Sequence, residues 1–204
     1  DSEESVNRAV AWLKREIVEA IPAAVYFFVG FQIIAFTDAL MLEEYGVRVS
    51  VLPMDLADPS APAELSRELA GRGIVLDVLV NNAGIGVYGF FAETPLEREL
   101  ATPPVNAVAL PHLTKLFLPG MLAPRRGRIL NVASTAAFQP GPIMAVYYAT
   151  KAYVLSLSEA LANECAGAGV TVTALCPGPT RTEFESRAGS PAEIAVRKKA
   201  FLMS

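Results

Sequence analysis

From Gly46 onward, short apolar runs rich in β-branched residues alternate with longer stretches whose apolar positions recur at helical spacing. The strand-like runs cover 47–52, 76–80, 128–132 and 170–175, and the helix-like stretches cover 61–70, 95–121, 144–166 and 191–203. The run 76–80 is nearly all apolar, which is typical of a strand buried on both faces of a parallel sheet. Strands that alternate with helices predict βαβ units, so we expect an α/β fold built on a parallel sheet.

The first 44 residues do not follow this alternation. Residues 21–36 contain one polar side chain, Gln32, and the apolar segment extends to 42 if Thr37 and Asp38 are included. Such a segment is long enough to span a bilayer. The alternative is a buried helix or a pair of strands in a soluble core. We therefore divide the chain into an N-terminal hydrophobic segment, 1–44, and a domain, 45–204, with 21–42 as a candidate for membrane contact.

Composition and charge exclude several classes of protein. The 204 residues are 52% hydrophobic and carry a net charge of −4, which argues against the basic surface of a nucleic-acid-binding protein. Two cysteines and one histidine, His112, are too few for a disulfide scaffold or for a Cys/His metal site. We therefore expect a cytoplasmic protein with reduced thiols, no metal and no nucleic-acid partner.

Short polar motifs follow two of the expected strands. The sequence Asn-Asn-Ala-Gly at 81–84 comes directly after the run 76–80, and Ser134 follows the run 128–132. In open parallel sheets, ligands bind beyond the carboxyl ends of the strands, so both motifs lie where a ligand would bind. Each also has an ordinary alternative, which is an Asn/Gly turn for the first motif and a capping or loop serine for the second.

Tyr147 and Lys151 lie four residues apart in the helix-like stretch 144–166 and therefore share one helix face. A phenol with a pKa near 10 exchanges protons poorly at neutral pH. A neighbouring ammonium group stabilises the phenolate and lowers that pKa, which would make Tyr147 a useful general acid or base. The alternative is a chance spacing, with Tyr147 a half-buried packing residue and Tyr148 a competing aromatic.

As a set, these motifs resemble the short-chain dehydrogenase/reductase family over residues 45–204. The resemblance rests on 81–84, on 129–134 (Ile-Leu-Asn-Val-Ala-Ser), on 147–151 (Tyr-Tyr-Ala-Thr-Lys), on Asp55-Leu56, on Asn106, and on Pro177-Gly178 followed by Thr182. It implies an α/β, Rossmann-like parallel sheet with helices on both faces, here lacking the first βα unit and the C-terminal end. It also implies an NAD(P)-dependent oxidoreductase that interconverts a carbonyl and an alcohol by hydride transfer.

Carried over by position, the resemblance assigns a role to each matching residue. Tyr147 would be the general acid/base, and Lys151 would lower its pKa and bind the nicotinamide ribose. Ser134 would hold the substrate oxygen, and Asn106 would position a water in the proton relay. NADP or NAD would be bound by Asp55, Leu56, Asn82, Ala83, Gly84, Tyr147, Lys151, Pro177, Gly178 and Thr182. The implied partners are a small carbonyl or alcohol substrate and further copies of the chain in a homo-oligomer.

Two features depart from the family's pattern. A Gly-rich turn for the pyrophosphate cannot be placed, because Gly30 is the one glycine before Gly46. Pro103 and Pro104 precede Asn106, so we expect them to delay the start of the helix and to shift Asn106. These departures leave two alternatives to an active reductase: a family remnant or chimera without cofactor binding, and a membrane-anchored α/β binding protein.

Overall fold

The computed structural model describes residues 50, 52–179, 184 and 188–189. They include a three-stranded parallel sheet in the order β1-β2-β3, with β1 at Val78–Asn81, β2 at Gly127–Val132 and β3 at Val170–Leu175. The parallel, Rossmann-like arrangement predicted from the sequence is therefore confirmed. The apolar segment 21–42, most of the expected strand 47–52 and the expected helix 191–203 lie outside the described residues.

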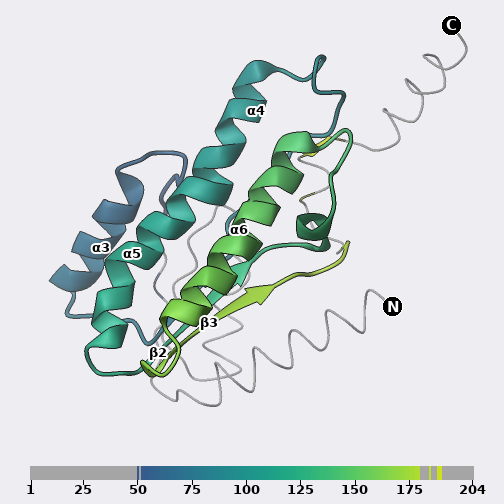
Figure 1. The fold of residues 1–204 in the computed structure, drawn as a ribbon. Coiled ribbons are helices and arrows are strands. Elements are labelled where there is room, and N and C mark those ends of the chain that lie inside the picture. The colour runs from purple at the N-terminus through teal and green to yellow at the C-terminus, as the bar shows by residue number, and fades with distance from the viewer. Residues whose placement is uncertain (1–49, 51, 180–183, 185–187, 190–204) are drawn as a thin grey trace, which may run out of the picture.

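Four α-helices are formed by the described residues: α3 (Ala61–Gly71), α4 (Leu96–Pro103), α5 (Ala109–Leu122) and α6 (Ala145–Glu164). Both connections, from β1 to β2 and from β2 to β3, step in the same direction across the sheet. The helices of such successive crossovers lie on the same face, and Figure 1 shows α5 and α6 side by side over the strands. None of the described helices is both long and apolar enough to cross a membrane.

The segment between α4 and α5 corrects one prediction made from the sequence. Pro103 and Pro104 have no N–H group, so two hydrogen bonds of a regular α-helix cannot form there. The chain nevertheless stays helical, because Pro104–Val108 forms a π-helix in which the Ala109 N–H donates to the Pro104 carbonyl. The prolines therefore widen the helix and do not delay its start. Asn106 lies inside this π-turn, where its side chain is buried.

Apolar side chains join the helices to the sheet in two clusters. The larger cluster holds α3, β1, α5 and β2 together, with Leu69, Met121 and Ile129 almost fully buried within it. The smaller cluster consists of Leu110, Ala133 and Val154 and joins α5 and α6 at the carboxyl end of β2. Each fully buried leucine, isoleucine or methionine contributes roughly 1.5–3 kcal/mol, so the two clusters hold the strand ends at fixed positions.

Candidate active site

The register of the sheet brings the three strand ends to one edge. Asn81 pairs with Asn131, and Val132 pairs with Leu175, so the segments that follow the strands leave the sheet together. Two further backbone hydrogen bonds extend this pairing: the Ala133 N–H donates to the Leu175 carbonyl at 2.8 Å, and the Thr135 N–H donates to the Pro177 carbonyl at 3.0 Å. Ser134, which lies between these two donors, is therefore held beside the segment 176–178.

Ser134 and Tyr147 meet at this edge. Tyr147 lies in the first turn of α6 and is half-buried. Burial raises the pKa of the Tyr147 phenol, while a hydrogen bond with the Ser134 side chain acts in the opposite direction. The Ser134 Oγ also accepts from the Ala136 N–H at 3.1 Å, which fixes its place at the start of the 3₁₀-helix η3 (Thr135–Phe138). The sequence-predicted pair of a serine and a tyrosine is thus brought together.

Lys151 lies one turn further along α6, and its side chain is only 4% exposed. Its Nζ donates to the Val132 carbonyl at 2.7 Å, and burial lowers the pKa of the ammonium group to about 8. The Nζ lies 5.8 Å from the centre of the Tyr147 ring. The expected lowering of the tyrosine pKa by Lys151 is not found in this geometry, because burial of the phenol dominates and Ser134 is the group that opposes it.

Asn106 is the centre of a set of hydrogen bonds that we call the active-site network, made of Ile85, Asn106, Thr150 and the Tyr147 carbonyl. The Asn106 Oδ1 accepts from the Ile85 N–H at 2.8 Å, and its Nδ2 donates to the Ile85 carbonyl at 2.8 Å and to the Thr150 Oγ1 at 3.0 Å. The Thr150 hydroxyl in turn donates to the Tyr147 carbonyl at 2.8 Å. The network ties the loop after β1 to the π-turn and to α6.

Gly84 completes this arrangement from the loop after β1. A Cβ at this position would lie 3.4 Å from the Lys151 Nζ and 3.6 Å from the Asn106 Oδ1. The absence of a side chain therefore leaves the ammonium group of Lys151 approachable from the side of the loop. Lys151 has three N–H donors and gives one to Val132, so among the described residues two remain for other acceptors.

Three residues beside Tyr147 were missed by the sequence analysis. The Phe184 ring lies 5.0 Å from the Tyr147 ring, measured between centres. A Cβ on Gly86 would come within 2.8 Å of Phe184 and 3.0 Å of the Met144 side chain. Gly86, Met144 and Phe184 therefore form an apolar wall around the phenol. Their residue types carried no signal, because methionine and phenylalanine are ordinary packing residues in most sequences.

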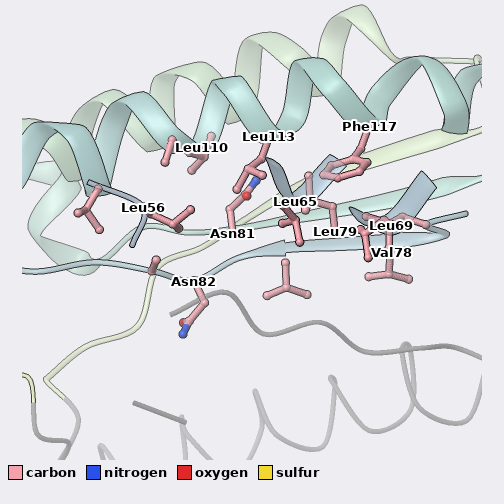
Figure 2. Close-up of a pocket in the computed structure, with 15 residues that line it drawn as sticks. Leu56, Leu65, Leu69, Val78, Leu79, Asn81, Asn82, Leu110, Leu113 and Phe117 are labelled. Atoms are coloured by element: carbon pink, nitrogen blue, oxygen red, sulfur yellow. The ribbon is translucent and has the colours of Figure 1, made fainter. Parts of the chain in front are cut away.

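The other sequence-predicted cofactor residues lie in several places. Leu56, Asn82 and Ala83 line one apolar pocket to which α3, β1 and α5 also contribute side chains, and Figure 2 labels Leu56 and Asn82 among its lining residues. No residue of the Ser134–Tyr147–Lys151 group lines this pocket. Asp55 is exposed, and its carboxylate accepts from the Ala57 N–H within its own turn. Pro177 and Gly178 follow β3, and the Pro177 carbonyl accepts from the N–H of Thr135, the neighbour of Ser134, while Thr182 falls outside the described residues.

A second buried set of hydrogen bonds, which we call the sheet network, joins Asn81, Thr114, Asn131 and Ser158. The Asn81 Nδ2 donates to the Asn131 Oδ1 at 2.8 Å and to the Thr114 Oγ1 at 3.2 Å. The Asn131 Nδ2 donates to the Ser158 Oγ at 2.9 Å. The sheet network links β1 and β2 to the helices α5 and α6. The Asn81 Oδ1 is buried and finds no hydrogen-bond partner among the described residues.

Comparison with known proteins agrees with this geometry. The model of the short chain dehydrogenase family matches residues 35–192. The chain belongs to the short-chain dehydrogenase family. Among the relatives of this family member, the ketoacyl reductase HetN of Nostoc sp. is 32% identical over 149 residues, which are 72% of the chain and 52% of the relative. D-beta-hydroxybutyrate dehydrogenase of Cupriavidus necator is 34% identical over 161 residues, which are 75% of the chain and 62% of the relative.

The chain thus spans between about half and two-thirds of the length of these curated relatives. Among solved structures, a short-chain dehydrogenase from Sphingobium yanoikuyae in complex with NADPH is similar, with a TM-score of 0.76 and 30% identity over 90% of this chain and 72% of that one. The relatives and structural neighbours of this family member are oxidoreductases, and several of these neighbours hold NADP or NADPH. The homo-oligomer, the membrane contact and the cytoplasmic location stay predictions.

Proposed function

We propose that this short-chain dehydrogenase carries the reacting site of a nicotinamide-dependent oxidoreductase, which interconverts a carbonyl and an alcohol with Tyr147 as the general acid/base. The observation that carries the proposal is the convergence of Ser134, Tyr147 and Lys151 at the carboxyl edge of a parallel sheet, where ligands of such sheets bind. The relatives named as a ketoacyl reductase and a hydroxybutyrate dehydrogenase act on this kind of group.

Each of the three side chains has a distinct part in the proposed chemistry. Burial raises the pKa of Tyr147, so the phenol stays protonated at neutral pH and can deliver a proton to a substrate oxygen that gains negative charge. The Ser134 hydroxyl lies beside the phenol and can hold the same substrate oxygen by a hydrogen bond. The Lys151 ammonium, with a pKa of about 8, is mostly charged at pH 7 and stabilises negative charge nearby.

The described residues fit the nicotinamide end of the cofactor. Two N–H donors of Lys151 remain for the ribose hydroxyls, and Gly84 leaves space next to them. Pro177 and Gly178 would border the nicotinamide, and a Cβ on Gly178 would have no heavy atom of the described residues within 4 Å. Asp55, Leu56, Asn82 and Ala83 would hold the adenine end. When bound, NADPH or NADH would supply the hydride, while the protein supplies orientation and a proton.

A titration of the purified chain with NADPH and with NADH tests this proposal. We follow nicotinamide fluorescence and the midpoint of thermal unfolding. A dinucleotide at about 100 times its dissociation constant should stabilise the folded chain by roughly 2.7 kcal/mol. No stabilisation at millimolar concentrations of either dinucleotide would reject cofactor binding and would favour the alternative of a family remnant without cofactor, for which the single glycine before Gly46 is the motivating observation.

The variant Tyr147→Phe tests the role of the phenol separately from binding. The substitution removes one hydroxyl and keeps the ring that contacts Phe184. Reduction of a ketone panel should fall by a factor of about 10²–10⁴, because the proton donor is lost. The dissociation constant for the dinucleotide should stay within about threefold of the wild-type value. Tyr148→Phe is the matched control, and undiminished turnover in Tyr147→Phe would rule out the assigned acid.

A further inference from the structure

Thr150 lies between the two reactive residues of α6 and has no role assigned so far. It precedes Lys151 directly and follows Tyr147 by three positions, and its side chain is only 6% exposed. Its hydroxyl donates to the Tyr147 carbonyl at 2.8 Å. Since a hydroxyl has one hydrogen to donate, the Thr150 Oγ1 can act toward Asn106 only as an acceptor.

This acceptor completes the hydrogen bonding of Asn106. The Asn106 amide has two N–H groups, one donated to the Ile85 carbonyl and the other to the Thr150 Oγ1. Its oxygen accepts from the Ile85 N–H. Every donor of this buried amide is therefore used, and the amide can point in one direction only. If Thr150 loses its hydroxyl, one N–H of a 2% exposed side chain is left without a partner, which is strongly unfavourable.

The contacts close a ring that returns to the reactive lysine. Asn106 holds both backbone groups of Ile85, and Ile85 directly follows Gly84. Gly84 lies against the Lys151 Nζ, and Lys151 is the neighbour of Thr150 in the chain. A displacement of Asn106 would therefore also move Ile85 and Gly84, which lie beside the Lys151 ammonium group.

We propose that Thr150 is a positioning residue: through the Asn106 amide, its hydroxyl holds Gly84 and Ile85 against Lys151 in the arrangement that binds the dinucleotide. This inference rests on the proposed function, because the loop and Lys151 are the groups assigned to the cofactor. The effect is indirect, and Thr150 itself need not touch the cofactor or the substrate.

The sheet network supplies a matched control for this residue. Thr114 is also a buried threonine whose hydroxyl accepts from an asparagine amide, in this case Asn81. The variants Thr150→Val and Thr114→Val remove the same group and keep nearly the same volume. Both should lower the free energy of unfolding, whereas only Thr150→Val should raise the dissociation constant for NADPH, by roughly 10-fold or more. We expect a larger change in KM for the dinucleotide than in kcat, and we expect Thr150→Ser to restore both values.

Hydrogen exchange of the Ile85 amide gives a readout that does not need activity. The Ile85 N–H is bonded to Asn106, and the Leu130 N–H in the middle of the sheet reports general loosening. Thr150→Val should speed exchange at Ile85 by at least about tenfold relative to Leu130, while Thr114→Val should leave this ratio unchanged. An unchanged ratio in Thr150→Val, or equal weakening of cofactor binding in both variants, would overturn the proposal.

The two proposals can fail separately. If the wild-type chain binds neither NADPH nor NADH, the proposed function fails, but the ratio of exchange at Ile85 and Leu130 still decides whether Thr150 holds the loop. If Thr150→Val does not fold, Thr150→Ala replaces it, because alanine has the highest helix propensity and also lacks the hydroxyl. Its exchange ratio should change in the same direction, and an unchanged ratio would count against the proposal.

Discussion

The active-site network and the sheet network are built from the same kinds of side chain but differ in how completely their groups are paired. In each, a buried asparagine donates to a threonine hydroxyl from another element. The Asn106 side chain uses both its N–H donors and its oxygen, and it binds both backbone groups of Ile85, which is 39% exposed. The Asn81 side chain leaves its oxygen unpaired among the described residues, and its Nδ2 donates to the side chains of Thr114 and Asn131.

This difference separates two uses of a buried amide. The sheet network joins strands and helices that the apolar clusters already hold together. An Asn81 oxygen with no partner among the described residues is therefore tolerated there. The active-site network fixes the loop after β1, whose residue Ile85 is 39% exposed and lies outside both clusters. At Ile85, the hydrogen bonds of Asn106 therefore supply a restraint that the two apolar clusters do not.

Alanine substitution of the central asparagine in each network should affect stability and dinucleotide binding in opposite order. Asn131→Ala should cost more stability, and Asn106→Ala should cost more affinity. Asn131→Ala should lower the free energy of unfolding by about 3 kcal/mol, because its partners are deeply buried and lose their hydrogen bonds. Asn106→Ala should lower it less, by about 2 kcal/mol, since water can reach Ile85. Dinucleotide binding should weaken about tenfold or more in Asn106→Ala only. Urea unfolding measures the loss of stability, and fluorescence titration measures the loss of dinucleotide affinity. If one variant showed the larger loss in both measurements, the two networks would not have these different roles.

The next largest difference is expected in how the free energy of unfolding depends on pH. The active-site network adjoins the ionisable Lys151, whereas the sheet network contains only neutral side chains. The pKa of Lys151 is about 8 in the folded chain and near 10.5 when unfolded. Between these values the unfolded chain binds more protons, so the free energy of unfolding rises with pH. The wild-type chain should gain about 2 kcal/mol relative to Lys151→Met between pH 7 and pH 9.5.

Urea unfolding of both proteins across this range measures the gain. The upper limit matters because the raised pKa of Tyr147 acts in the other direction: above pH 10 the folded chain retains a proton that the unfolded chain releases, and stability falls. The double variant Lys151→Met with Tyr147→Phe separates the pH dependence due to Lys151 from that due to Tyr147. Parallel pH profiles for the wild-type chain and Lys151→Met would show that the ammonium group is not desolvated in the folded chain.

Local rules indicate the position of the candidate site residues, while the resemblance to the family assigns their roles. Ser134 follows a strand, and Tyr147 and Lys151 share one helix face because they lie four residues apart. The π-turn could not be predicted, because two prolines indicate a break, whereas the bond from Ala109 to Pro104 depends on the packing of the completed helix. The direction of the tyrosine pKa likewise depends on burial, which spacing does not reveal.

The apolar wall and the role of Thr150 depend on contacts between distant segments. Phe184 reaches Tyr147 from beyond β3, and the partner of Thr150 lies 44 positions earlier in the chain. Neither contact leaves a periodic pattern in the sequence. The alternation of strands and helices along the chain is enough to predict the parallel sheet. The contacts of Phe184 and Thr150 arise only from tertiary packing, so the sequence pattern does not predict them.

The smallest expected effect concerns the unpaired oxygen of Asn81, and it tests whether the sheet network is as incomplete as its geometry indicates. Asn81→Ala should lower the free energy of unfolding by about 1 kcal/mol less than Asn131→Ala does, because the lost side chain includes a buried oxygen that has no partner among the described residues. In the double variant, the loss in free energy of unfolding should be smaller than the sum of the two single losses by about 1 kcal/mol. When both amides are removed, neither is left without its hydrogen-bond partner. Urea unfolding of the four proteins in this double-mutant cycle measures the coupling. Additivity within about 0.3 kcal/mol would mean that Asn81 and Asn131 act independently, and the hydrogen bond between them could not then be a stabilising link across the sheet.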